Sequence, residues 1–358
     1  MRAARVLLAS LLGYAALEAL IFHSGLYASI ASPDSGAGLV DTFLDNERRR
    51  PLDGPNQVVA IGNSRMGLFP RVANKLQSET GYTFATIAVA GTSPRCWYYM
   101  LRENDPDRNR YAAVVIGLDN YDDMELWEDH ADREYDVGLI AARLGLRDVG
   151  EFAGSYETWA HRWLAVRGIV FKGALYSRDI QNFLLNPAAR LASVSQSRRD
   201  SHIWFHDYIA TSSTMDGVSI DWSTRTMTVP PERSAAQKRA YEITLLDALP
   251  PDRGQHEKYM HLWMGKIYEL YRGSRTRLVF VRLPHGPLVR PDFPPAKAHS
   301  SVRELAARGE ATLIEEHLFD SMERPEFFWD ELHLNEPGIQ QFSSALAREM
   351  RRVLGPPR

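Results

Sequence analysis

The chain is almost free of cysteine, with Cys96 as the only one among 358 residues. A single cysteine excludes an internal disulfide and a zinc site built from cysteines, so we interpret Cys96 as a small buried apolar residue. Strong charge bias is also missing, because the formal net charge is -3. The basic clusters at 48–50 and 198–199 lack interleaved aromatic residues and are interpreted as solvated loops, so we expect no nucleic-acid partner.

Long apolar runs are rare as well, and the clearest one lies near the N-terminus. Residues 6–22 are apolar except for Ser10 and Glu18, which gives a stretch near the lower length limit for crossing a bilayer. Arg2 and Arg5 precede this stretch and would keep the amino end in the cytoplasm. The remainder of the chain would then be exported.

This segment is either a signal anchor or a cleaved signal peptide. Small residues at 29–31 offer a cleavage site, but the apolar run extends through Leu26 and Tyr27, which favours retention. We therefore expect residues 1–35 to form a signal anchor and a short linker in a single-pass protein of the cytoplasmic membrane. Residues 6–27 would contact the membrane, and the following domain would lie on the periplasmic or extracellular side.

The rest of the composition is that of a globular protein. Hydrophobic residues make up 44% of the chain and charged residues 24%, so it can bury one large core or two smaller ones. It lacks the compositional bias of a disordered protein, and no internal repeat is visible.

A short β-branched run leads directly to a serine. Residues 58–61 (Val-Val-Ala-Ile) are typical of a buried parallel strand, and Gly62-Asn63-Ser64 follow at once. Open α/β sheets place their ligand crevice at the carboxyl ends of such strands, and a helix within 70–80 would favour negative charge at its amino end. Ser64 is therefore a candidate nucleophile, and the alternative is an ordinary polar turn.

Two further predicted strands end in a glycine followed by small or polar residues. Residues 83–89 lead to a turn that contains Gly91, and residues 111–116 lead to Gly117-Leu118-Asp119-Asn120. Such strand ends can direct backbone amides, or an amide side chain, at the oxygen of a tetrahedral intermediate.

The base and acid of a hydrolase are predicted near the C-terminus. Asp330 and His333 belong to the segment Asp-Glu-Leu-His-Leu-Asn, which precedes a helix-like tail at 336–354. A histidine three positions after an aspartate can lie on the same side of a turn. The carboxylate then orients the imidazole through Nδ1, while Nε2 faces a hydroxyl.

Together these segments resemble the SGNH, or GDSL-like, hydrolase superfamily, whose members carry four short blocks in this order. The matching segments are Gly62-Asn63-Ser64-Arg65, Gly91, Gly117-Leu118-Asp119-Asn120 and Asp330 to His333. The resemblance implies that Ser64 attacks, His333 is the general base and Asp330 orients it. It also implies that the amides of Ser64 and Gly91 form an oxyanion hole, and that residues 36–358 form one domain of this kind.

The third block departs from the family pattern, which reads Gly-x-Asn-Asp. Its last two residues are reversed here, so Asp119 occupies the position of the amide donor, where an ionised carboxylate would repel an oxyanion. Either Asn120 reaches the site through a local shift, or the third donor is missing, or Asp119 faces elsewhere. Asn63 also stands where many members have aspartate. These departures resemble the membrane-anchored branch that acts in polysaccharide O-acetylation and in D-alanylation of teichoic acids.

The middle of the chain, about 121–273, is predicted to be a mainly helical insertion. Residues 235–249 and 256–271 are typical of amphipathic helices, and the turn-rich stretch 212–231 favours a short hairpin. Four tryptophans could line a sugar groove, but packing in a core is the favoured role. They are Trp159, Trp163, Trp204 and Trp222.

After the insertion the sheet is expected to resume, with strands at 277–283 and 311–314 around a helix at 300–308. Alternating strands and helices predict an α/β fold, a three-layer α/β/α sandwich with a parallel five-stranded sheet. Arg282 and His285 would then stand at the same edge as Ser64. With Arg65 they are candidates for substrate binding, and His285 is an alternative base, although structural roles are favoured for Arg282 and His285.

These patterns lead to a membrane-anchored, extracytoplasmic serine esterase or acyltransferase that acts on acyl groups, chiefly acetyl, of a cell-envelope or secreted polysaccharide. We expect no metal and no cofactor, and a polysaccharide-modification complex is the expected partner. A lipid or small-molecule esterase is a further enzyme hypothesis, although no lid-like apolar run supports it. The alternative from another class is a weak or inactive binding or assembly component of a polysaccharide export machine.

Overall fold

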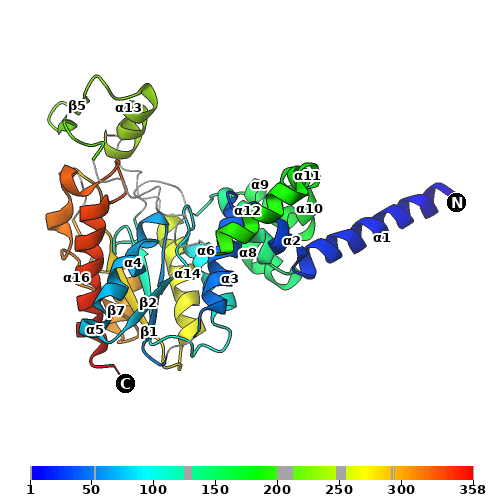
Figure 1. Ribbon diagram of the computed structural model, residues 1–358, viewed down its shortest axis with the longest axis horizontal. Helices are drawn as coiled ribbons and strands as arrows, with labels where there is room; N and C mark the ends of the chain where they lie inside the picture. The colour runs from blue at the N-terminus through cyan, green and yellow to red at the C-terminus, as the bar shows by residue number, and fades with distance from the viewer. Residues whose placement is uncertain are drawn as a thin grey trace. The chain divides into compact units, whose positions relative to one another are not determined.

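The computed structural model describes residues 2–51, 54–124, 131–199, 213–246, 255–291, 293 and 295–357. The chain divides into two compact units (Figure 1). The helical unit comprises residues 1–48 and 131–201, and the sheet unit comprises residues 49–130 and 202–358. The units therefore do not follow the predicted boundary at residue 35, because residues 36–48 group with the N-terminal helices rather than with the sheet.

The sheet unit is an α/β fold around one parallel sheet, which confirms the predicted fold class. Its five strands are arranged in the order β2-β1-β3-β6-β7. They are β1 (Gln57–Ile61), β2 (Thr83–Thr86), β3 (Ala113–Leu118), β6 (Arg277–Arg282) and β7 (Thr312–Leu313). All the residues of β1 and β3 are buried, as is expected for strands covered on both faces.

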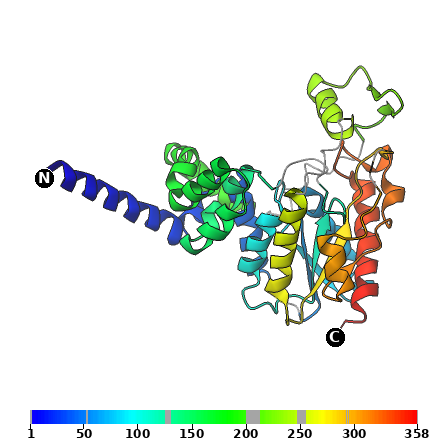
Figure 2. The same ribbon diagram turned by 180° about the vertical axis from the view of Figure 1, so that it is seen from behind.

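Helices cover both faces of the sheet (Figure 2), so the unit is a three-layer sandwich. Its α-helices are α4 (Phe69–Ala73), α5 (Gln77–Thr80), α6 (Pro94–Asn104), α13 (Ala235–Tyr241), α14 (Gln255–Tyr271), α15 (Ser301–Ala307) and α16 (Glu336–Leu354). Short helical turns complete it: η1 (Ser64–Met66), η2 (Asn74–Leu76), the π-helical turn Glu242–Leu246, η7 (Asp320–Met322) and η8 (Pro325–Phe327). The helix predicted within 70–80 is therefore broken into α4, η2 and α5, whereas α16 has the predicted bounds.

One hydrophobic core of the sheet unit lies between the sheet and helices α4 and α16. Alternate side chains of the central strands point to this side, so Val58 and Ala60 of β1 pack with Phe69 of α4 and with Phe342 and Leu346 of α16. The predicted burial of Cys96, in α6, is confirmed.

The helical unit contains no described strand. Its α-helices are α1 (Arg2–His23), α2 (Leu26–Ile30), α3 (Gly36–Arg49), α7 (Tyr135–Ile140), α8 (Val149–Gly154), α9 (Trp159–Val170), α10 (Lys172–Leu175), α11 (Ser177–Leu185) and α12 (Pro187–Arg199), with short turns η3 (Ala141–Arg143) and η4 (Leu146–Asp148). Within the described chain, one helix is long and apolar enough to cross a membrane, over Arg2–Phe22, with a mean hydropathy of 1.7.

The predicted insertion is split between the two units. Its first part supplies α7–α12 to the helical unit, and its second part supplies α13, α14 and the predicted hairpin, β4 (Ser219–Asp221) with β5 (Thr226–Thr228), to the sheet unit. The expectation of core packing is wrong for Trp159 and Trp163, which are 77% and 55% exposed. Trp222 is partly buried, and Trp204 lies outside the described residues.

Two glycines make room for one methionine at the carboxyl edge of the sheet. A Cβ at Gly117 would come 2.4 Å from Met66 Cγ, and a Cβ at Gly62 would come 2.9 Å from the same atom. Gly62 also has a φ of 157°, which disfavours other residues. The side chain of Met66 therefore fills a notch between the ends of β1 and β3, which fixes the turn that carries Ser64.

This notch predicts that Gly117→Ala lowers the free energy of unfolding by about 1–3 kcal/mol, because the added methyl group overpacks against Met66. Gly265→Ala is the matched control, since Gly265 lies within α14 and a Cβ there meets no atom within 4 Å. The control should be neutral or up to about 1 kcal/mol more stable. Denaturant unfolding of both variants measures the difference, and equal stabilities would contradict the proposed role of the notch.

Candidate active site

The candidate nucleophile lies at the carboxyl end of β1. The strand ends at Ile61, and Gly62 leads into η1, whose first residue is Ser64. Asn63 caps this turn, because its side-chain oxygen accepts a hydrogen bond from the backbone N–H of Arg65 at 3.1 Å. Ser64 is partly exposed, so the turn fixes its position without covering it.

The candidate acid and base come from the turn before α16. Asp330 Oδ1 accepts hydrogen bonds from the backbone N–H groups of Leu332, at 2.9 Å, and His333, at 2.6 Å. Asn335 then caps α16 by accepting from the backbone N–H of Gly338 at 3.0 Å. The turn therefore brings Asp330 and His333 to the same side, as the spacing predicts.

The structure brings Ser64, His333 and Asp330 together. Ser64 Oγ lies 2.8 Å from His333 Nε2, and His333 Nδ1 lies 2.9 Å from Asp330 Oδ2. An ionised carboxylate only accepts hydrogen bonds, so Nδ1–H donates to Asp330 and the lone pair of Nε2 accepts from the serine hydroxyl. This is the arrangement in which histidine can remove the proton of a serine nucleophile.

The environment of Asp330 keeps its carboxyl group ionised. Burial acts to raise its pKa, but hydrogen bonds from the His333 ring and from the backbone N–H groups of His333 and Leu332 outweigh burial. The pKa of Asp330 is therefore lowered from its ordinary value. The negative charge next to Nδ1 stabilises the imidazolium that forms when His333 accepts a proton.

Gly91 lies in a loop that is attached to the Ser64 turn. The hydroxyl of the neighbouring Thr92 lies 3.0 Å from the carbonyl oxygen of Gly62 and 2.7 Å from that of Val89. Trp97 Nε1 donates to the Thr92 hydroxyl at 3.0 Å. This network holds the Gly91 loop next to the turn that carries Ser64, where the resemblance predicts one wall of an oxyanion hole.

The backbone N–H of Ser64 is a donor at the same place. Ser64 is the first residue of η1, so its N–H has no partner within that turn. Among the residues that the structure describes, none accepts a hydrogen bond from it. It can therefore donate to an oxygen that develops negative charge beside Oγ.

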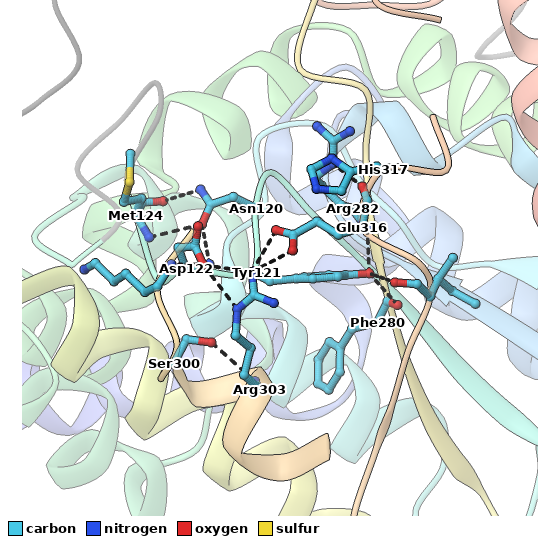
Figure 3. Close-up of polar contacts among 12 residues, drawn as sticks. Asn120, Tyr121, Asp122, Met124, Phe280, Arg282, Ser300, Arg303, Glu316 and His317 are labelled. Carbon is cyan, nitrogen blue, oxygen red and sulfur yellow. Dashed lines mark hydrogen bonds and ion pairs between the residues drawn. The ribbon is translucent and has the colours of Figure 1, made fainter. Parts of the chain in front are cut away.

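The side chains of Asp119 and Asn120 both bind other groups of the protein, so neither is placed as an oxyanion donor. Asp119 forms a buried ion pair with Arg65, which corresponds to the third of the predicted alternatives. Asn120 Nδ2 donates to the Met124 carbonyl at 3.0 Å, and its Oδ1 accepts from the backbone N–H of Asp122 at 2.7 Å (Figure 3). The prediction of Asn120 as an oxyanion donor is therefore corrected, because its amide is engaged in a local turn.

Arg65 has a structural role rather than the predicted substrate-binding role. Its side chain is only 4% exposed, pairs with Asp119 and donates to the Pro284 carbonyl at 3.0 Å. Burial, with a further contribution from the positive charge of Arg282, lowers its pKa to about 9. At neutral pH the guanidinium therefore stays protonated and balances the charge of Asp119.

Arg282 and His285 form a second ion network at the end of β6. Arg282 Nη1 donates to Glu323 Oε1 at 2.9 Å, and Arg282 also pairs with Asp320. His285 Nδ1 lies 3.0 Å from the same Glu323 oxygen. His285 is therefore not the base for Ser64, because His333 occupies that position. The sequence analysis did not identify Glu323 as the partner of Arg282, because the two residues are 41 positions apart and no local pattern links them.

Two pockets adjoin Asn120. The smaller has a volume of about 30 Å³, enough for a water molecule or a methyl-sized group, and its lining includes Asn63, Thr92, Trp97, Gly117 and Met260. The larger has a volume of about 220 Å³ and includes Arg282, His285, Phe293, Glu316 and Asp320. Within the described residues, no group of three or more His, Cys, Asp or Glu side chains could hold a metal ion.

The Arg65–Asp119 ion pair predicts that removing one partner lowers the free energy of unfolding much more than removing both. Asp119→Ala should lower the free energy of unfolding by about 3–5 kcal/mol, because it leaves a buried arginine without its counter-ion. The double variant Arg65→Met and Asp119→Ala should be more stable than Asp119→Ala, since no buried charge remains. Denaturant unfolding of the three proteins measures this, and a double variant no better than the single one would argue against the pair.

The lowered pKa of Asp330 predicts a stability contribution that depends on pH. A carboxyl whose pKa is lower in the folded than in the unfolded state stabilises the fold fully above the unfolded pKa, about 3.9, and loses that effect as pH falls through the folded value. The stability difference between the native chain and Asp330→Asn should therefore be constant from neutral pH to about 5 and shrink in stronger acid. Unfolding measured across this range tests it, and a constant difference at all pH values would contradict it.

Comparison with known proteins does not assign the chain to a family. No family model matches the chain, and no curated protein is significantly similar to it.

Proposed function

We propose that the sheet unit is an SGNH-like serine hydrolase or acyltransferase domain. The observation that carries this proposal is the distance of 2.8 Å between Ser64 Oγ and His333 Nε2, with Asp330 on the other ring nitrogen. These residues come from opposite ends of the unit. They meet at the carboxyl edge of a parallel sheet, which is where this class of fold places its ligands.

The chemistry is acyl transfer through a covalent intermediate. Ser64 Oγ attacks the carbonyl carbon of an ester while His333 Nε2 takes the hydroxyl proton. The carbonyl oxygen becomes negative and accepts from the backbone N–H of Ser64 and from the Gly91 loop. His333 then gives its proton to the leaving alcohol as the ester bond breaks. Water or a sugar hydroxyl resolves the acyl-enzyme, again with His333 as the base.

The proposed substrate is a small acyl ester, chiefly acetyl, on a cell-envelope or secreted polysaccharide. A pocket of about 30 Å³ beside Asn63 and Gly117 has room for a methyl-sized acyl group and little more. Helix α1 would act as a single-pass anchor, with Arg2 and Arg5 on the cytoplasmic side and the sheet unit outside the cytoplasmic membrane. A polysaccharide-modification complex in the envelope is the proposed setting.

A second candidate function is that of a weakly active or inactive binding or assembly component of a polysaccharide export machine. Asn120 donates its amide to Met124, and Asp119 is paired with Arg65. Only backbone N–H groups would then stabilise the negative charge of the oxyanion. Loss of one oxyanion-hole donor typically slows an enzyme by about 100- to 1,000-fold.

Catalysis predicts that the full-length protein hydrolyses an activated acetyl ester and is labelled by a serine-directed fluorophosphonate. Ser64→Ala should abolish labelling and lower the hydrolysis rate about a thousand-fold or more, because the nucleophile is gone. Ser223→Ala is the control, since Ser223 is an exposed residue of the turn between β4 and β5, and it should leave both signals unchanged.

The outcomes separate the two functions. Labelling that survives Ser64→Ala would show that Ser64 is not the nucleophile. A native chain that is neither labelled nor active, with its fold intact by circular dichroism, would favour the binding or assembly function.

A further inference from the structure

Helix α1 contacts the rest of the helical unit partway along its apolar length. The rings of Tyr14 and Phe171 lie 6.3 Å apart, at the junction of α9 and α10. The backbone N–H of Gly173 donates to both carboxylate oxygens of Glu18, at 3.1 and 3.0 Å. At the inner end of α1, Phe22 belongs to one apolar cluster with Tyr176 and with Ile180 and Phe183 of α11.

These contacts set the depth of α10 relative to a membrane. The apolar segment of α1 ends at Phe22. At a rise of 1.5 Å per residue, Glu18 lies about 6 Å and Tyr14 about 12 Å back from this end. If α1 crosses a bilayer, the start of α10 lies at about these depths, which resembles the 5–10 Å immersion of interfacial helices.

The same region exposes large apolar side chains. Trp159 and Trp163 are four residues apart in α9 and therefore share a face of that helix. Further exposed residues follow at the end of α9 and in α11 and α12. Each of the following is at least 46% exposed: Trp159, Trp163, Phe171, Leu184, Leu185 and Leu191. Exposed apolar side chains gathered in neighbouring helices, with tryptophan among them, are typical of membrane-contact regions.

The charge of this region is strongly one-sided. Between residues 159 and 199 the sequence has seven arginine or lysine residues and a single acidic one, Asp179, although the whole chain has a net charge of -3. Arg167 and Arg178 are exposed, in α9 and α11. Basic helices with exposed tryptophan and leucine bind the headgroups of anionic lipids while their apolar side chains enter the interface.

We infer that α9–α12 form a second membrane-contact surface, which lies in the interface of an anionic bilayer beside α1. This inference rests on the proposed role of α1 as a membrane anchor. The helical unit would then lie on the bilayer through α9–α12 as well as through α1. The carboxylate of Glu18 would enter the membrane bound to the backbone of α10 rather than facing lipid.

The test uses the full chain in vesicles of phosphatidylcholine and phosphatidylglycerol. Cys96 is replaced by alanine, and single cysteines labelled with an environment-sensitive fluorophore are placed by Trp163→Cys and Leu185→Cys. Leu8→Cys, in the exposed apolar part of α1, reports insertion of the anchor. Ser223→Cys, in the exposed turn of the sheet unit, is the water-facing control.

We expect lipids with a nitroxide near the headgroup to quench the probes at 163 and 185, and deeper nitroxides to quench the probe at position 8. The probe at 223 should stay unquenched. Water-like probes at 163 and 185 with a shielded probe at 8 would overturn the inference and assign this surface to a protein partner. A water-like probe at position 8 would overturn the anchor as well, while the Ser64-dependent reaction, measured on the same samples, tests the proposed chemistry separately.

A charge reversal gives a second readout. Arg167→Glu with Arg178→Glu should shift the docking equilibrium by about fivefold or more per arginine and reduce quenching at position 185. The effect should vanish in vesicles of phosphatidylcholine alone, where no anionic headgroup is present. Quenching that is equal in both lipids and unaffected by charge reversal would overturn the electrostatic part of the inference.

Discussion

The ion pair of Arg65 with Asp119 holds together the edge of the sheet that carries Ser64. Arg65 follows β1, Asp119 follows β3, and the Pro284 carbonyl that also accepts from Arg65 follows β6. Three adjacent strand ends are therefore joined by one guanidinium that is almost fully buried. Because Arg65 directly follows Ser64, the same contacts fix the turn that presents the serine hydroxyl to His333.

This pairing also explains how a carboxylate is tolerated so near a proposed oxyanion site. The charge of Asp119 is balanced by Arg65, so it does not stand as a bare negative charge beside the nucleophile. A second buried arginine, Arg282, is balanced in the same way by Glu323 and Asp320. The edge thus carries two paired arginines, and the Ser64 region relies on backbone donors for any stabilisation of negative charge.

The helical unit binds the one acidic side chain of its apolar N-terminal helix. In the proposed membrane anchor Glu18 would be unfavourable, yet both of its carboxylate oxygens accept from the backbone N–H of Gly173 in α10. A charge that is costly in lipid is therefore bound by the protein itself. The inferred membrane contact would explain both the exposed basic and aromatic residues of α9–α12 and the apolar length of α1.

Much of the fold follows from local patterns. The apolar run at 58–61, the glycine after it and the capped tail at 336–354 predicted β1, its turn and α16, because strand and helix signals depend on neighbouring residues. The spacing of Asp330 and His333 predicted their pairing for the same reason. The sequence by itself therefore determined the α/β class and singled out the serine, histidine and aspartate that the structure brings together.

The tertiary structure decided which of the other polar groups belong to the site. Asp119 could be assigned only once its partner, far away in the sequence, was in place, and Glu323 carried no local signal at all. The grouping of residues 1–48 with 131–201 likewise depends on packing between distant helices. Side-chain periodicity records which face of an element is buried, but it does not record which distant element covers that face, and that choice is made only by packing in three dimensions.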